Sequence, residues 1–161
     1  MNKTIQIAPV RKSVTVDATP AEAFAFFTGK VDRWWPKDHH IGKSPVVASA
    51  IEPFVGGRWY SRHEDGEEAV VGHVRVWEPG ARFVVGWEIS GEWKPEPRVN
   101  LSSEVEVRFI ADGARTRVEL EHRNFERMES GGQAMRDGVD QGWPGILETY
   151  ATMCSQGASQ P

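Results

Sequence analysis

Two histidines are the residues whose type and spacing best suit chemistry near neutral pH. In the segments RWYSRH and TRVELEHR, alternation places His63 on the same strand face as Trp59, and His122 on the same face as Leu120. If these imidazoles point into a cavity, they could hydrogen-bond a ligand or act as a general base. We favour the alternative, in which each lies near its strand end and bonds to water or backbone, because buried polar groups usually have structural partners.

A metal site or a cysteine nucleophile is not expected. His39 and His40 are adjacent in a polar loop segment, so they do not suit a metal-binding pair, and no cysteine or carboxylate cluster completes a zinc site. We therefore expect exposed loop histidines. The single cysteine, Cys154, cannot form an internal disulfide and is expected to be a small buried residue near the end of an apolar helix.

The carboxylates do not form an acid and base pair. Four glutamates alternate with apolar residues on two neighbouring strands: Glu104, Glu106, Glu119 and Glu121. We expect them to face solvent and to pair with nearby arginines, where each ion pair contributes little. The chain also lacks a G-x-S-x-G nucleophile motif, a P-loop and a dinucleotide-binding glycine motif, so no cofactor is expected.

A long C-terminal helix must position these residues. Between Gln133 and Met153, seven apolar residues recur at steps of three and four, which places them on one helical face. They are Met135, Val139, Trp143, Ile146, Leu147, Tyr150 and Met153. Pro144 removes one backbone hydrogen bond inside this pattern, so we expect one bent helix, broken near Trp143, that lies across a sheet.

The sheet is predicted from seven alternating segments. The first strand begins at Val10, and a short helix follows with Thr19 as its N-cap and Gly29 at its end. A further brief helical turn leads to Pro36. Six strands then follow in hairpin steps, over residues 45–53, 58–63, 69–77, 82–89, 102–110 and 116–123. Strands with one solvated face pair antiparallel, so we predict an α+β fold in which a curved sheet wraps around the helix.

The segment 69–77 is predicted to be a regular strand. Alternation along it places His73 on one face with Arg75 and Trp77, and Val71 falls on that face too. Because two of these side chains are polar, we expect His73 on the outer surface of the sheet.

The composition favours one domain. A chain of 161 residues with 39% hydrophobic and 26% charged residues can bury a single sizeable core. We expect residues 10–154 to form it, with a flexible N-terminus over 1–9 and a flexible tail over 155–161. The net charge of -4 comes from interspersed charges, which disfavours nucleic acid and anionic membranes as partners. Neither a signal peptide nor a long apolar run is present, so a cytoplasmic location is expected.

Seven tryptophans are the unusual feature of the composition. Tryptophan joins a large apolar body to one N–H donor, so it builds cores and also lines pockets. Trp34 and Trp35 are adjacent and cannot both face the core, so one of them lies near the surface or a cavity mouth, or else the pair closes the end of the barrel. The sequence does not decide between these two predictions.

Several patches resemble a known family. GGRWYSR at 56–62, GHVRVWEPGARFVVGW at 72–87, EVEVRF and TRVELEH within 104–122, and GW…IL…Y at 142–150 are similar to homologues of the heat-shock protein 90 ATPase activator, within the START-like (SRPBCC) superfamily. The resemblance implies a helix-grip fold with an apolar cavity between the long helix and the sheet. The eukaryotic activators use a further N-terminal domain for part of the chaperone contact, and this chain has no room for one, which argues against that activity. A homodimer is left open.

The function expected first is binding of a small, mainly apolar ligand, aromatic or lipid-like, in that cavity. The expected walls are Trp35, Trp59, His63, Phe83, Val85, Trp87, Val107, Leu120, His122, Trp143, Leu147 and Tyr150. One alternative is a cyclase or dehydratase with His63 or His122 as general base. Another is a protein-interaction module, linked to a chaperone, that uses an exposed tryptophan patch.

Overall fold

The computed structural model describes residues 6–36 and 44–158 of the chain, so the expected loop histidines His39 and His40 lie outside the described residues. The elements, in chain order, are β1 (Val10–Val16), α1 (Pro20–Gly29), α2 (Val31–Trp34), β2 (Val46–Ile51), β3 (Arg58–His63), β4 (Glu68–Glu78), β5 (Arg82–Trp87), η1 (Val99–Leu101), β6 (Ser103–Asp112), β7 (Arg115–Arg123), η2 (Phe125–Arg127) and α3 (Gly132–Ala158).

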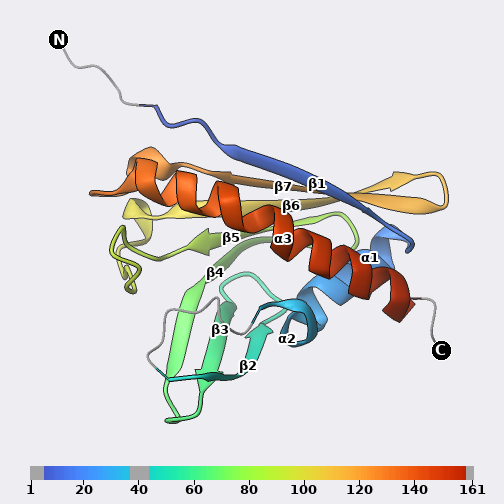
Figure 1. Ribbon diagram of the computed structural model, residues 1–161, viewed down its shortest axis with the longest axis horizontal. Coiled ribbons are helices and arrows are strands. Elements are labelled where there is room, and N and C mark those ends of the chain that lie inside the picture. The colour runs from blue at the N-terminus through green and yellow to red at the C-terminus, as the bar shows by residue number, and fades with distance from the viewer. Residues whose placement is uncertain (1–5, 37–43, 159–161) are drawn as a thin grey trace.

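The seven strands form one curled sheet with the order β1-β7-β6-β5-β4-β3-β2, and every neighbouring pair is antiparallel. Helix α3 lies across this sheet, and α1 and α2 lie near the C-terminal part of α3 (Figure 1). Lys12 of β1 ties the edge strand to α3, because its Nζ lies 2.9 Å from Asp140 Oδ1. The predicted helix-grip architecture, with a curved antiparallel sheet and a long C-terminal helix, is confirmed.

Helix α1 begins where its sequence predicts. Thr19 Oγ1 accepts a hydrogen bond from the backbone N–H of Glu22, and Glu22 Oε1 accepts one from the N–H of Thr19, which is a complete capping box. Pro20 occupies the first turn. The helix buries Phe24 and Phe27 and so fills one end of the space inside the sheet.

Helix α3 buries the predicted face and continues through Pro144 as one helix. Six of the seven predicted apolar residues are buried, and Met153 is half-buried. The expected break near Trp143 is wrong. Pro144 is on the exposed side of the helix, where water can hydrate the carbonyl oxygen of Asp140 that has lost its N–H partner. No helix in the described part of the chain is both long and apolar enough to cross a membrane.

Strand β4 departs from the predicted regular alternation. Its pairing with β5 shifts register between Val74 and Val76, so Arg75 is an extra residue, and its pairing with β3 shifts in the same way. His73 is therefore on the outer face, as predicted, whereas Trp77 is turned inward against Phe24, at 5.0 Å between ring centroids. The prediction that Trp77 shares a sheet face with His73 is wrong, because the extra residue Arg75 reverses the alternation of side chains along β4.

The prediction that all four glutamates of β6 and β7 face solvent is also wrong in one case. Glu106 is only 2% exposed. Its carboxylate is covered by the guanidinium groups of Arg82, Arg108 and Arg123, which come from three different strands. Glu106 is on the outer face of the sheet, but its charge is buried because the long arginine side chains cover it.

Candidate functional site

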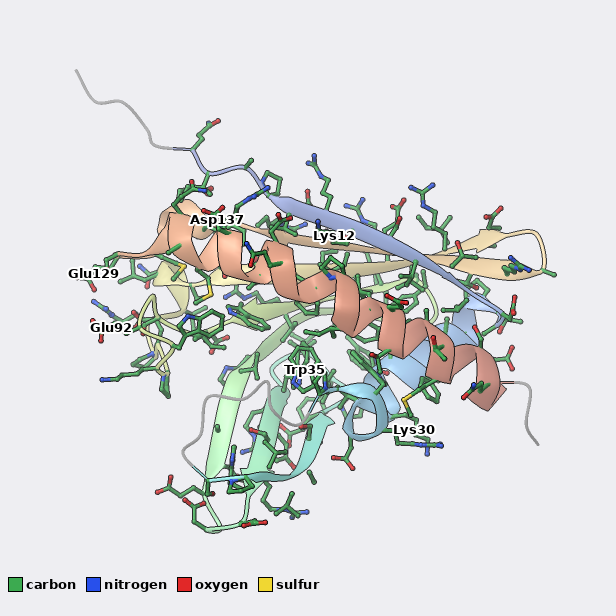
Figure 2. All side chains as sticks on the ribbon, viewed as in Figure 1. Lys12, Lys30, Trp35, Glu92, Glu129 and Asp137 are labelled. Carbon is green, nitrogen blue, oxygen red and sulfur yellow. The ribbon has the colours of Figure 1, made fainter. Side chains whose placement is uncertain are left out.

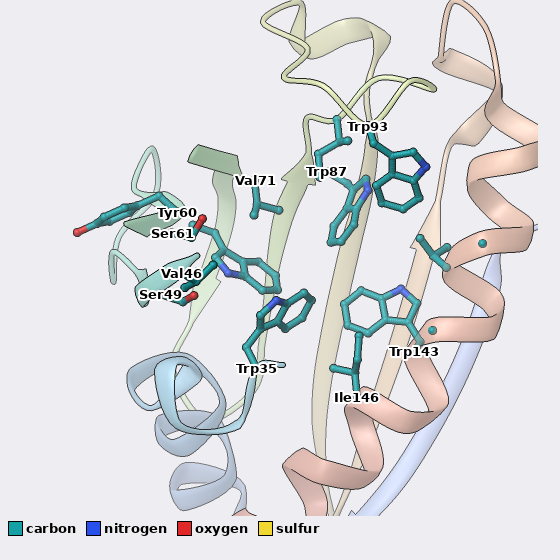
Figure 3. A pocket seen from close by; sticks show the side chains of 15 residues that line it. Trp35, Val46, Ser49, Tyr60, Ser61, Val71, Trp87, Trp93, Trp143 and Ile146 are labelled. Carbon is teal, nitrogen blue, oxygen red and sulfur yellow. The ribbon is translucent and has the colours of Figure 1, made fainter. Parts of the chain in front are cut away.

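A cavity of about 350 Å³ lies between α3 and the strands β2 to β5. Five of the seven tryptophans line it: Trp35, Trp59, Trp87, Trp93 and Trp143. Aliphatic side chains complete most of the wall: Val46, Val71, Ile89, Val139 and Ile146. Trp35 projects from the chain after α2 into the space beneath α3, and faces Trp143 of that helix (Figures 2 and 3). The cavity is thus mainly apolar and aromatic, which suits a small organic ligand.

Contacts between the indoles hold the wall in shape. The ring centroids of Trp35 lie 5.0 Å from those of Trp59 and 5.8 Å from those of Trp143, both in edge-to-face geometry. Trp87 lies 5.8 Å from Trp143 and 6.4 Å from Trp59. Each of these four indoles therefore contacts two of the others. Edge-to-face and tilted contacts of this kind are favourable for aromatic pairs. Such a wall offers flat faces and edges to a planar ring system.

Trp87 contributes one polar group to this part of the molecule. Its side chain is 5% exposed, and among the described residues its Nε1 is the one buried side-chain nitrogen or oxygen without a hydrogen-bond partner. An unpaired buried N–H costs about 1–3 kcal/mol. An oxygen acceptor that reached this N–H would remove that cost.

His122 lies behind this wall rather than at its surface. Its Nδ1 accepts a hydrogen bond from Trp143 Nε1 at 3.2 Å, so the ring proton is on Nε2, which lies 2.9 Å from Ser103 Oγ. Burial lowers the pKa of His122 to about 3. The imidazole is therefore neutral at physiological pH, and it fixes the orientation of Trp143.

His63 is also buried, but it contacts the cavity wall through a neighbour. Its Nδ1 lies 2.7 Å from the carbonyl oxygen of Ser44, and its Nε2 lies 2.8 Å from Ser61 Oγ. Ser61 lines the cavity. A backbone carbonyl can only accept, so Nδ1 carries the proton and Nε2 accepts a hydrogen bond from the serine hydroxyl.

The structure separates the residues expected from the sequence to form the site. Trp35, Trp59, Trp87 and Trp143 lie together at the cavity wall. The remaining eight are buried and do not line it: His63, Phe83, Val85, Val107, Leu120, His122, Leu147 and Tyr150. For Phe83 and Tyr150 the reason is α1, since Phe27 packs against them with ring centroids 5.5 and 4.8 Å apart and fills that part of the space.

Several wall residues were missed by the sequence analysis. Gly138 and Gly142 of α3 open the helix surface toward the cavity, and Trp93 faces them from the loop after β5. A methyl group added at Gly142 would meet no atom within 4 Å, whereas one at Gly138 would lie 3.7 Å from Trp93. Glycines four residues apart beside an apolar stripe are a signal for this opening. Ser49, Tyr60 and Ser61 carried no such signal.

Comparisons with known proteins agree with this architecture. The family model described as "Activator of Hsp90 ATPase homolog 1-like protein" matches residues 17–153. No curated protein matches the chain.

Several solved structures are similar to this chain. Txn09, described as an anthrahydroquino-gamma-pyrone synthase, is 38% identical, with 91% of this chain and 97% of that chain covered and a TM-score of 0.65. CalC from Micromonospora echinospora, described as a self-sacrificing resistance protein, is 35% identical, with 95% and 97% covered and a TM-score of 0.69. The Aha1 dimer from Colwellia psychrerythraea is 12% identical, with 96% and 100% covered and a TM-score of 0.65, and supports the fold alone.

Proposed function

The chain belongs to the family of activator of Hsp90 ATPase homolog 1-like proteins, within the START-like superfamily, and from that premise we propose that it binds a flat aromatic ligand. The ligand is mainly apolar, carries a carbonyl or quinone-type oxygen, and occupies the tryptophan-lined cavity. The observation that carries this proposal is the mainly apolar, tryptophan-lined cavity, together with the buried, unpartnered N–H of Trp87 in its wall.

The relatives support the aromatic character of the ligand. The name of Txn09 denotes the synthesis of an oxygenated fused-ring aromatic compound, and that protein shares 38% of its residues with this chain over most of both lengths. Fold likeness by itself does not identify a ligand. The agreement between this name and the indole wall favours a fused-ring aromatic over a flexible fatty chain.

A pair of probes that differ only in their oxygens tests the proposal. We expect 9,10-anthraquinone to quench the indole fluorescence saturably, and anthracene to bind more weakly. Trp87→Phe should weaken anthraquinone binding about 10-fold, or about 1.4 kcal/mol, and leave anthracene binding nearly unchanged. Equal effects of Trp87→Phe on both probes would exclude Trp87 as the donor.

Two glycines of α3 provide a matched control for the location of the ligand. Gly142→Leu projects a side chain into the cavity, where a Cβ atom meets no atom within 4 Å. Gly145→Leu adds the same group to the same helix, also with no atom within 4 Å, at an exposed position outside the cavity. We expect the first variant to abolish binding of both probes and the second to retain it. Binding that survives Gly142→Leu would place the ligand elsewhere.

The alternative functions gain less support. A cyclase or dehydratase that uses His122 as its base is disfavoured, because that imidazole lies behind Trp87 and Trp143 and its pKa is lowered to about 3 by burial. An interaction module would need an exposed group of indoles. All seven tryptophans are in the described part of the chain, and Trp93 is the one exposed tryptophan among them, with 47% of its surface accessible.

A further inference from the structure

Ser61 and His63 have the arrangement of a nucleophile and its base. They are two residues apart on β3, so both side chains project from the inner face of the sheet. Ser61 Oγ lies 2.8 Å from His63 Nε2 and lines the cavity, whereas His63 lies behind it. A hydroxyl, a base in hydrogen-bond reach and a third group that orients the base are the recurring parts of nucleophilic catalysis.

The third group is the backbone carbonyl of Ser44, which accepts the proton of His63 Nδ1 at 2.7 Å. This contact fixes the tautomer, so the lone pair of Nε2 points at the Ser61 hydroxyl. The carbonyl is itself held in place, because the turn after β3 bonds to the same segment: Glu64 N–H donates to the Pro45 carbonyl at 3.0 Å. The pair is therefore preorganised for proton transfer.

We propose that Ser61 is a catalytic nucleophile toward an aryl ester held in the cavity, with His63 as its base. This activity rests on the proposed function, because the same cavity holds the aromatic part of the ester. Ser61 Oγ attacks the ester carbonyl carbon while its proton passes to His63 Nε2. The carbon–oxygen bond to the aryl group then breaks, and the leaving phenolate takes the proton from His63.

Water completes the cycle. A water molecule attacks the acyl group on Ser61, with His63 Nε2 accepting its proton and returning it to Ser61 Oγ as that oxygen leaves. The products are a phenol and a carboxylic acid, and no oxidant, reductant or cofactor is consumed.

The strand opposite provides a matched control. Ser49 of β2 pairs directly with Ser61 across the sheet and also lines the cavity. None of the hydrogen bonds in the described part of the chain joins Ser49 Oγ to a histidine. A serine on the same cavity wall, without a base, therefore shows what the cavity alone contributes.

The test uses 2-naphthyl acetate as substrate and a fluorophosphonate as a covalent probe, with the full chain. We expect the wild-type protein to release 2-naphthol and to carry the phosphonate on Ser61, as located by tandem mass spectrometry. Ser61→Ala should lose roughly 100-fold or more of the rate and all labelling, and His63→Gln should lose a similar factor in rate. Ser49→Ala should keep the label on Ser61, and its rate should fall far less than that of Ser61→Ala, because Ser49 lines the cavity without a base. Labelling at another residue, or equal losses in Ser49→Ala and Ser61→Ala, would overturn the assignment.

Binding separates failure of this activity from failure of the proposed function. Saturable quenching of indole fluorescence by anthraquinone in Ser61→Ala would show that the cavity still binds aromatic molecules. If the wild-type protein binds anthraquinone but neither hydrolyses 2-naphthyl acetate nor is labelled at Ser61, the nucleophile is excluded and the binding function stands. If it binds no anthraquinone, the proposed function fails first. Because Ser61→Ala removes one oxygen atom only, it keeps the test decisive even where His63→Gln does not fold.

Discussion

Glu106 carries a negative charge where water barely reaches it. Burial by itself raises the pKa of this carboxyl, but hydrogen bonds from Arg108, Arg123 and Arg82 outweigh burial and lower the pKa to about 2. Arg108 Nε and Arg82 Nη1 lie 2.8 and 3.1 Å from the same carboxylate oxygen. One residue thus joins three strands of the outer sheet face through charge.

We predict that Glu106→Gln destabilises the fold by about 2 kcal/mol at pH 7. Removing one member of a fully buried ion pair destabilises a fold by more than about 2 kcal/mol. Here the three arginines are a quarter to a half exposed, so solvent screens their charges and the loss of stability is smaller. Because the folded pKa is below the ordinary value of 4.5, this stabilisation is full above pH 4.5 and is lost as the pH falls toward 2. Urea unfolding at pH 7 and at pH 3 should therefore show a smaller difference at pH 3.

Glu119→Gln is the control for that measurement. Glu119 is on the neighbouring strand, pairs with Arg117 and is a third exposed, so its loss should change stability by less than about 0.5 kcal/mol. A loss as large as that of Glu106→Gln would mean that the buried position is not what matters.

His122 predicts a different pH dependence. Its folded pKa of about 3 is below the ordinary value of 6.5, so the unfolded chain binds the extra proton between these values and stability falls as the pH is lowered below 6.5. Between pH 6.5 and 5 the loss should be about 2 kcal/mol. His122→Gln removes the titration, so its stability should be lower at pH 7 but flatter across this range, as urea midpoints would show. Parallel curves for the two proteins would contradict the buried neutral histidine.

At the scale of elements, α3 accommodates a proline that its sequence pattern does not favour. The N–H missing at Pro144 leaves the Asp140 carbonyl without its helical partner, yet the helix continues without interruption from Gly132 to Ala158. The exposed position of Pro144 permits this arrangement, whereas the same residue on the buried face would leave the carbonyl without water.

We predict that Pro144→Ala stabilises the fold by about 2 kcal/mol. The alanine N–H can bond to the Asp140 carbonyl, and this gain exceeds the entropy that proline removes from the unfolded chain. Glu148→Ala, at an exposed position of the same helix, should stay within about 0.5 kcal/mol of the wild type. The free energy of unfolding in urea measures both. An unchanged or lower stability for Pro144→Ala would show that the proline supports the helix.

At the scale of the whole molecule, the order of the elements was predictable because each strand and helix has its own hydrophobic period. Alternation along β6 and β7 places Val107 and Leu120 inward, and the three- and four-residue steps of α3 place Leu147 inward. The bulge at Arg75 was not predictable, because an extra residue in β4 leaves no mark in its composition.

The cavity was predictable only in part, because its boundary depends on which apolar faces meet which others. The inward-facing tryptophans indicated an aromatic wall, and four of them do lie together. Whether Phe83 lines a cavity or lies in closed core depends on Phe27 of α1, which packs against it from a segment far away in the chain. The cover over Glu106 likewise requires arginines from three strands, and only the pairing register brings them together.

The position of β1 at one edge of the sheet affects how the chain is made. β1 is the first of the seven strands of this sheet to be synthesised, but it pairs with β7, the last of them, so Val10 has no partner until His122 has been made. Until Arg123 has been synthesised, this strand exposes its valines and an unpaired backbone edge, which are features that promote aggregation of nascent chains. The time that β1 stays unpaired during synthesis is therefore set by the length of chain between β1 and β7, and a more stable finished fold does not shorten that time.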